Sequence, residues 1–122
     1  RVVIDHFMKP QIANHSKDNF RFWAEGVSAL AEETSAYMKF SGLVTEASDD
    51  WSIDDLRPYV EHILNSFGAK RILWGSDWPV CRLRAEYEVW HSAATELTNS
   101  LPSEDKADLF GGNAVRAYKL LV

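Results

Sequence analysis

The stretch RILWGSDWPVC, residues 71–81, passes from an apolar run into a Gly-Ser-Asp-Trp-Pro cluster. Its first part, Arg71–Gly75, is continuously apolar after the arginine, which is typical of a strand covered on both faces in a parallel sheet. Asp77 follows this run, beside an aromatic ring and a proline that fixes the loop. A solvated loop needs no such combination. The stretch therefore predicts a buried parallel strand that ends at a functional carboxylate.

Two further β-rich runs precede this one, Val2–Asp5 and Tyr37–Ser41. The three runs start about 35 residues apart, which is the length of a βα unit with its loops. After each run, apolar residues recur at helical spacing. The segments with this spacing are residues 18–35, 53–67 and 83–101. The order of elements is therefore β-α-β-α-β-α.

Local end signals refine this prediction. Ser52 followed by Asp55 resembles a capping box at the start of the second helix. The C-terminal part predicts two short helices, PSEDKADLF (102–110) and AVRAYKLL (114–121). Asn113 is expected to be the N-cap of the last helix, because asparagine favours that position.

Two α/β architectures are compatible with this order of elements. Right-handed crossovers would place the three strands side by side in one parallel sheet, either in a doubly wound domain or in part of a (β/α)8 barrel. A complete barrel needs about 250 residues, so 122 residues would form a piece of one. The sequence begins with Arg1 and enters a strand at once, which favours the piece. We expect residues 1–122 to form a single partial domain.

Composition excludes several classes of function. The net charge of −5 gives no electrostatic reason to bind nucleic acid or an anionic membrane. No apolar run approaches the roughly 20 residues that span a bilayer. Cys81 is the single cysteine, so an internal disulfide is impossible and a reducing, cytoplasmic location is expected. We therefore expect neither a nucleic-acid nor a membrane partner.

Polar residues stand at the carboxyl ends of all three predicted strands. His6 follows the first strand, Ser41 and Gly42 follow the second, and Asp77 follows the third. In parallel α/β folds, the loops at these ends converge, and the chemistry of the protein gathers there. We therefore expect one site that contains His6, Ser41 and Asp77.

Five blocks of the sequence resemble consecutive blocks of amidohydrolase-superfamily enzymes of the amidohydrolase-2 type. The blocks are VIDHFMKP, KFSGLVTEA, DLRPYVEHILNSFG, RILWGSDWPVC and FGGNAVRAYKL. The chain is most similar to the sugar-lactone hydrolase branch that includes L-fuconolactonase. The resemblance extends from Val2 to Leu121. It implies a distorted (β/α)8 TIM barrel to which this chain contributes strands six to eight and the terminal helices.

The resemblance also implies roles for individual residues. Asp77 matches the catalytic aspartate after strand eight, and His6 matches the histidine after strand six. The family's His-x-His pair of strand one is missing, since the histidines are His6, His15, His62 and His91. The chain therefore resembles the C-terminal portion of a lactonase a little over twice as long. Relatives commonly carry glycine where this chain has Met8.

A lactone is a cyclic ester, and the residues at the strand ends suit its hydrolysis. Asp77 is expected to act as general base or as a metal ligand, and His6 to orient substrate or donate to the carbonyl oxygen. One divalent ion such as zinc would need ligands that this chain lacks. The fragment is expected to be inactive alone. Its exposed strand edges favour a dimer.

Each candidate residue also has a structural interpretation. Asp77 could be a helix cap, and His6 a hydrogen-bonded structural histidine. Trp51 and Trp78 lie in the loops at the strand ends, where an indole either stacks on a sugar ring or packs the loop onto the barrel. Ser41 is either a hydrogen-bond donor to substrate or simply the end of a strand.

Two other functions are compatible with the sequence. One is a decarboxylase of the same superfamily, since such enzymes also carry an aspartate after strand eight. The other is a non-catalytic α/β domain that binds a small ligand. That domain would usually carry a glycine-rich phosphate-binding turn after its first strand, and DHFMKP has none. Outside the site, His62 lies off the apolar stripe of its helix and is expected to be solvated.

Overall fold

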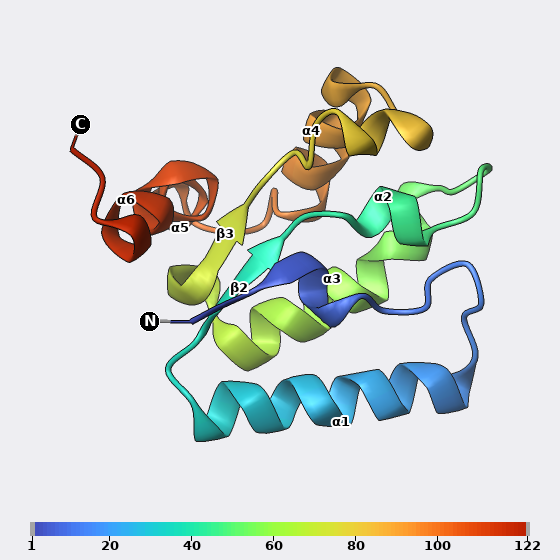
Figure 1. Cartoon of the computed structure of the whole chain (residues 1–122), viewed down its shortest axis with the longest axis horizontal. Coiled ribbons are helices and arrows are strands. Elements are labelled where there is room, and N and C mark those ends of the chain that lie inside the picture. Colours follow the sequence, from blue (N-terminus) through green and yellow to red (C-terminus); the bar gives the residue numbers. More distant parts are fainter. Residues whose placement is uncertain (1, 122) are drawn as a thin grey trace.

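The computed structural model describes residues 2–121 and contains one three-stranded parallel sheet (Figure 1). The strands are β1 (Val3–Ile4), β2 (Tyr37–Phe40) and β3 (Ile72–Trp74), in the spatial order β1-β2-β3. Each predicted β-rich run forms a strand, shorter than the run by one to two residues in total at its ends. Arg1 and Val122, the first and last residues of the expected domain, lie outside the described residues.

A helix follows each strand where the apolar periodicity predicts one, but the third spans Tyr87–Leu97 and is shorter than the predicted 83–101, since Leu83 lies in a separate turn and is 70% exposed. The α-helices are α1 (Lys17–Glu33), α2 (Leu43–Glu46), α3 (Ile53–Phe67), α4 (Tyr87–Leu97), α5 (Ser103–Ala107) and α6 (Asn113–Tyr118). Single tighter or wider turns are η1 (Asp5–Met8), η2 (Ala69–Arg71), η3 (Val80–Leu83) and η4 (Asp108–Gly112). The short helix α2 was not predicted, because one helical turn is too short to show a periodic pattern.

The predicted capping box holds the start of α3. The backbone N–H of Ser52 donates to the Asp55 carboxylate at 2.9 Å. Gly68 ends the helix with φ +77°, a conformation that residues with a Cβ rarely adopt. The capping box and Gly68 thus bound a helix that matches the segment 53–67 expected from sequence.

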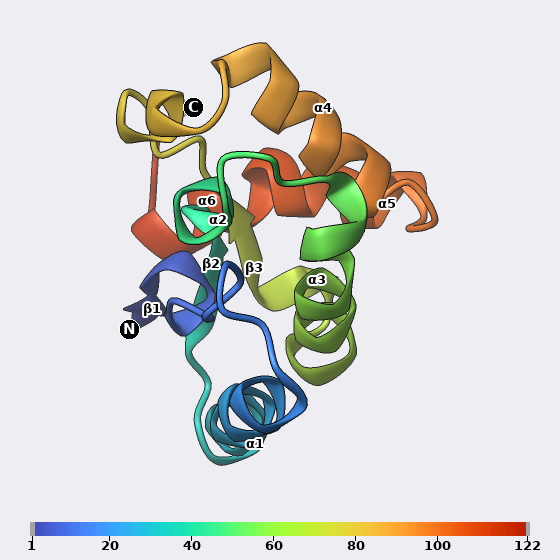
Figure 2. The same ribbon diagram turned by 90° about the vertical axis from the view of Figure 1, so that its right-hand side faces the viewer.

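Helices α1, α3 and α4 lie on the same side of the sheet, and the core lies between them and the strands (Figure 2). Met38, Phe40 and Ile72 point into this core and are buried. Phe40 packs edge-on against Trp90 of α4, with 5.5 Å between ring centroids. Burial of each such side chain stabilises the fold by about 1.5–3 kcal/mol. The residues that alternate with them along β2, Tyr37 and Lys39, face the other way and are half-buried.

Asn113 is not the N-cap of the last helix, as the sequence suggested. It lies inside α6, and its side chain is fully buried. The Asn113 amide donates to the carbonyl oxygens of Ala69 at 2.6 Å and Ile72 at 2.8 Å. Ala69 lies in the turn η2 just before β3, and Ile72 is the first residue of β3. Buried carbonyl oxygens such as these need hydrogen-bond donors. A long-range contact therefore replaces the expected local cap.

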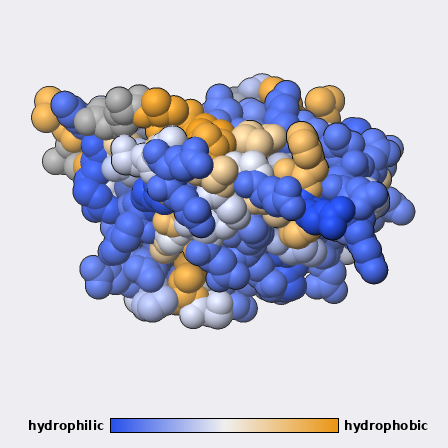
Figure 3. All heavy atoms as spheres, turned by 90° about the horizontal axis from the view of Figure 1, so that it is seen from below, coloured by the Kyte–Doolittle hydropathy of each residue, from blue (hydrophilic) through white to orange (hydrophobic). Residues whose placement is uncertain are grey.

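The face of the molecule that carries α1 is mostly hydrophilic, and hydrophobic side chains gather at the end where the two termini lie (Figures 1 and 3). Val2, beside the unpaired edge of β1, is 62% exposed. No helix within residues 2–121 is both long and apolar enough to cross a membrane.

Candidate active site

The three strands deliver His6, Ser41 and Asp77 to one place, as the sequence predicted. The Nδ1 atom of His6 lies 2.7 Å from the Ser41 hydroxyl oxygen. The Nε2 atom of His6 lies 4.0 Å from a carboxylate oxygen of Asp77. Ser41 is fully buried, whereas the side chains of His6 and Asp77 are each 24% exposed. The buried serine therefore holds the imidazole in place through Nδ1. The side chains of His6 and Asp77 remain partly exposed and can contact a ligand.

His6 begins a left-handed turn directly after β1. Four consecutive residues, His6 to Lys9, have φ between +50° and +62°. Each such residue costs about 1–2 kcal/mol relative to the right-handed conformation, so the rest of the fold must hold the turn. Phe7 is buried and stacks on Phe40 at 5.0 Å, and its carbonyl accepts a 2.7 Å hydrogen bond from the Trp23 indole.

The turn also holds Met8 in a conformation that favours glycine. Met8 has φ +62°, a conformation that glycine adopts at no steric cost. Strained backbone that the surroundings hold in place is typical of functional sites. The turn points the His6 ring at Ser41 and Asp77 instead of continuing the strand.

Gly42 provides the space for the His6 ring. Its φ is +70°, and a Cβ atom at this position would lie 2.7 Å from His6 Nδ1 and 2.8 Å from its Cγ. Real Cβ atoms do not approach other atoms so closely. A glycine is therefore required after Ser41 on both backbone and steric grounds. Sequence reasoning noted Gly42 but did not predict this contact.

Asp77 lies on a tight loop and has φ +58°. Its backbone carbonyl accepts a hydrogen bond from the Cys81 N–H at 2.9 Å. The N-cap of the turn that follows, η3, is Pro79, and no side-chain hydrogen bond caps that turn, so the structure gives no support to the helix-cap interpretation of Asp77. Burial, and then the nearby Asp77 carboxylate, raise the pKa of the Cys81 thiol. Cys81 is therefore a buried, protonated side chain and not a nucleophile.

The two tryptophans of the loops have different surroundings. Trp78 is 60% exposed, beside Asp77, and its backbone N–H donates to the Ser76 hydroxyl at 3.1 Å. The Trp51 indole N–H donates to the Arg84 carbonyl at 3.2 Å, and its ring packs against the core. Trp51 therefore ties two loops together, whereas the Trp78 ring is free to contact a ligand.

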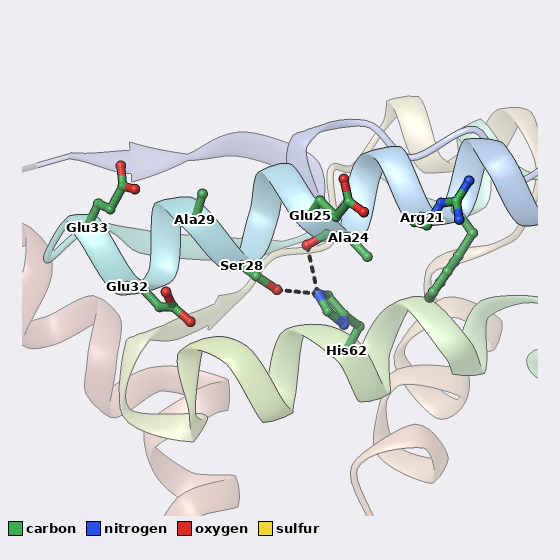
Figure 4. A pocket seen from close by; sticks show the side chains of 9 residues that line it. Arg21, Ala24, Glu25, Ser28, Ala29, Glu32, Glu33 and His62 are labelled. Carbon is green, nitrogen blue, oxygen red and sulfur yellow. Dashed lines mark hydrogen bonds between the residues drawn. The ribbon is translucent and has the colours of Figure 1, made fainter.

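A groove of about 550 Å³ between α1 and α3 lies apart from these residues (Figure 4). His62 lies in it and is half-buried, so its predicted solvation is wrong. His62 Nε2 lies 3.0 Å from both the Ala24 carbonyl and the Ser28 hydroxyl. A carbonyl only accepts, so Nε2 carries the proton and has no lone pair to activate Ser28. The groove therefore contains no serine nucleophile.

The Nε2 atom of His6 and the carboxylate of Asp77 are of the types that serve as zinc ligands in proteins. A hydrogen bond at the other ring nitrogen, such as the one between His6 Nδ1 and Ser41, orients a histidine that binds a metal. However, residues 2–121 contain no group of three or more His, Cys, Asp or Glu side chains that could hold a metal ion. The described residues by themselves do not make a metal site. Any such site would need ligands from outside this chain.

Several known proteins are similar to this chain in sequence and in fold. L-fucono-1,5-lactonase from Burkholderia ambifaria is 37% identical over 124 residues, which cover 98% of this chain and 42% of that protein. The crystal structure of an amidohydrolase from Burkholderia multivorans with bound HEPES is 34% identical, with a TM-score of 0.90 over 98% of this chain and 44% of that one. A second crystal form of a Burkholderia multivorans amidohydrolase, with bound zinc, has a TM-score of 0.89.

The chain spans less than half the length of these relatives. The close structural match confirms that the three βα units are part of a (β/α)8 barrel, and the doubly wound alternative is not supported. The family model described as Amidohydrolase matches residues 1–120. On this match and on the lactonase relatives, the chain belongs to the amidohydrolase family of hydrolases.

Proposed function

We propose that this chain is a single partial domain that supplies one side of the active site of a sugar-lactone hydrolase. The convergence of His6, Ser41 and Asp77 at the carboxyl ends of three neighbouring strands is the observation that carries the proposal. Relatives that are 36–37% identical are L-fucono-1,5-lactonases, which supports a sugar lactone as the substrate class.

Asp77 acts as the general base. Its carboxylate takes a proton from water as the water oxygen bonds to the lactone carbonyl carbon. The ring C–O bond then breaks, and the proton passes to the leaving alkoxide, which gives a hydroxy acid. The 4.0 Å gap between His6 Nε2 and Asp77 is longer than a hydrogen bond, so both atoms are free to face a substrate.

His6 and Ser41 form a pair in which only the histidine reaches the substrate. If the Ser41 hydroxyl accepts from His6 Nδ1–H, Nε2 carries a lone pair, and if Ser41 donates to Nδ1, Nε2 carries a proton. In the second state, His6 can donate to an oxygen of the lactone. We propose Ser41 as a positioning residue of His6, since its own hydroxyl is fully buried. Trp78 supplies an exposed ring for the sugar face.

The Burkholderia multivorans relative with bound zinc supports a divalent metal ion as the cofactor of the complete enzyme. Asp77 and His6 would be the two ligands that this chain offers to such an ion, and further ligands would come from the part of the barrel that it lacks. When bound, a divalent ion would polarise the lactone carbonyl. The steps above use only the side chains of this chain.

The proposal is tested in a lactonase chimera, in which this chain replaces the matching 42% of the Burkholderia ambifaria lactonase. Asp77→Asn keeps the shape of the side chain but removes its basicity. We expect kcat for a sugar 1,5-lactone to fall about 10²–10⁴-fold, which is the usual value of general acid–base catalysis, with no change in melting temperature. Asp18→Asn is the matched control, because the Asp18 side chain is 90% exposed on α1.

A chimera that folds but hydrolyses no sugar lactone would contradict the proposed function. An Asp77→Asn chimera that melts normally and keeps the turnover of the unmodified chimera would contradict the role of Asp77 alone. These two outcomes are distinct, because the first concerns the reaction and the second concerns one side chain.

A further inference from the structure

Lys39 is a charged residue in the middle of the central strand. It lies between Met38 and Phe40, which point into the core, and it pairs in register with Leu73 of β3. Side chains alternate along a strand, so Lys39 points away from the helices. A lysine on this face of a strand in a small barrel is unusual, because such positions are normally filled by apolar side chains.

The Lys39 side chain runs along the sheet toward the candidate active site. A Cβ atom placed on Gly75 would lie 2.9 Å from Lys39 Cε and 3.9 Å from its Nζ. Gly75 comes two residues after Leu73, the register partner of Lys39. Two residues along a strand span about 6.6 Å, so the side chain extends this far toward the carboxyl ends of the strands.

The amino end of the Lys39 side chain lies near Ser41. The Cβ atom of Ser41 lies 3.7 Å from the same point above Gly75. Lys39 Nζ and Ser41 are thus both within 4 Å of one position, and Ser41 in turn holds His6. The absence of a side chain at Gly75 is what allows the lysine to pass.

The Lys39 ammonium has no acidic partner within residues 2–121. No carboxylate of these residues lies within 4.0 Å of its Nζ, although other lysines and arginines of the chain form such pairs. A half-buried cation is costly unless a negative group or hydrogen-bond acceptors compensate it. The side chain extends past Gly75 toward Ser41, so the ammonium lies on the side of the sheet where a ligand of the candidate site would offer a negative oxygen.

We propose that Lys39 is a catalytic residue that binds the carbonyl oxygen of the lactone. This inference rests on the proposed function and adds the group that stabilises the charge of the reaction. When water attacks the carbonyl carbon, the electron pair of the C=O bond moves to this oxygen, and the ammonium donates a hydrogen bond to it. Lys39 keeps its proton throughout, while Asp77 carries the proton from water to the leaving alkoxide. After ring opening, Lys39 faces the carboxylate of the product.

Lys39→Met in the lactonase chimera tests this role, because methionine keeps an unbranched side chain as far as Cε and removes only the ammonium group. We expect kcat to fall by roughly 10²-fold or more, as for the loss of one oxyanion donor, with a smaller change in KM. Inhibition by the sugar-acid product, measured with the sodium salt of L-fuconic acid, should weaken about tenfold, since the carboxylate loses a charged partner. Lys17→Met, at the exposed start of α1, should change neither value.

A second measurement tests the path of the side chain over Gly75. Gly75→Ala should lower kcat in the chimera with Lys39, because the new methyl group displaces the lysine. In a Lys39→Ala background, the same change should have no further effect on kcat. This double-mutant cycle remains informative if Lys39→Met lowers the melting temperature.

Three outcomes would overturn the inference. A folded chimera without lactone turnover would overturn both this role and the proposed function. A turnover in Lys39→Met within threefold of the unmodified chimera would overturn the role of Lys39 alone. Equal effects of Gly75→Ala with and without Lys39 would show that the lysine does not pass over Gly75.

Discussion

Gly42→Ala is the substitution for which the structure gives the most definite expectation. Gly42 has φ +70°, and the new Cβ atom would lie 2.7 Å from His6 Nδ1. An L residue in the left-handed region costs about 1–2 kcal/mol, and the loss of the His6–Ser41 hydrogen bond costs about 1 kcal/mol more. We therefore expect the free energy of unfolding to fall by about 2–3 kcal/mol.

The same substitution should damage catalysis separately from stability. The His6 ring must move away from the new methyl group, and a displacement of about 1 Å at a catalytic group can cost 10²-fold in rate. We expect kcat/KM of the lactonase chimera to fall by about that factor. Turnover of a sugar 1,5-lactone is measured well below the unfolding midpoint, and stability is measured by urea denaturation.

Gly68→Ala is the matched control. Gly68 also has a positive φ, +77°, but a Cβ atom at this position would meet nothing within 4 Å. This variant should lose stability through its backbone alone and keep its kcat/KM. If the kcat/KM of Gly42→Ala equals that of Gly68→Ala, the position of the His6 ring does not depend on Gly42. The close approach of the two residues would then have no effect on catalysis.

Two further predictions concern the stability of the chain and its need for the rest of the barrel. Asn113→Asp places a carboxylate against the carbonyl oxygens of Ala69 and Ile72, so it should destabilise the chimera more than Asn113→Ala, which costs about 1–3 kcal/mol. Urea denaturation measures both, and equal losses would contradict the donor role of the Asn113 amide. The isolated 122-residue chain should self-associate at micromolar concentration through its two unpaired strand edges and hydrolyse no sugar lactone. Light scattering after gel filtration and a lactone assay test this, and a stable monomer or clear turnover would count against it.

Much of the fold could be predicted because its signals are local. The apolar run before Asp77 and the helical spacing of residues 53–67 report burial over a few consecutive residues, and both form the expected elements. The convergence of His6, Ser41 and Asp77 was also predictable, since parallel strands bring their carboxyl ends to one edge. The sequence order alone was sufficient for that inference.

Other features depend on contacts between residues far apart in the sequence. Asn113 has the residue type of a cap, but it donates to carbonyls more than 40 positions away, and His62 bonds to α1 although it lies off the apolar stripe of its own helix. Local patterns report only neighbours along the chain, so they predict neither contact.

The sequence by itself determined the order of strands and helices, the family blocks, and the three polar residues at the strand ends. Only the tertiary structure decided how those residues are held. The left-handed turn at His6 is stable because Phe7 is buried against Phe40, and the Lys39 side chain extends toward Ser41 because Gly75, directly after β3, has no side chain in its path. Both features arise from packing between neighbouring strands, which exists only after the chain has folded.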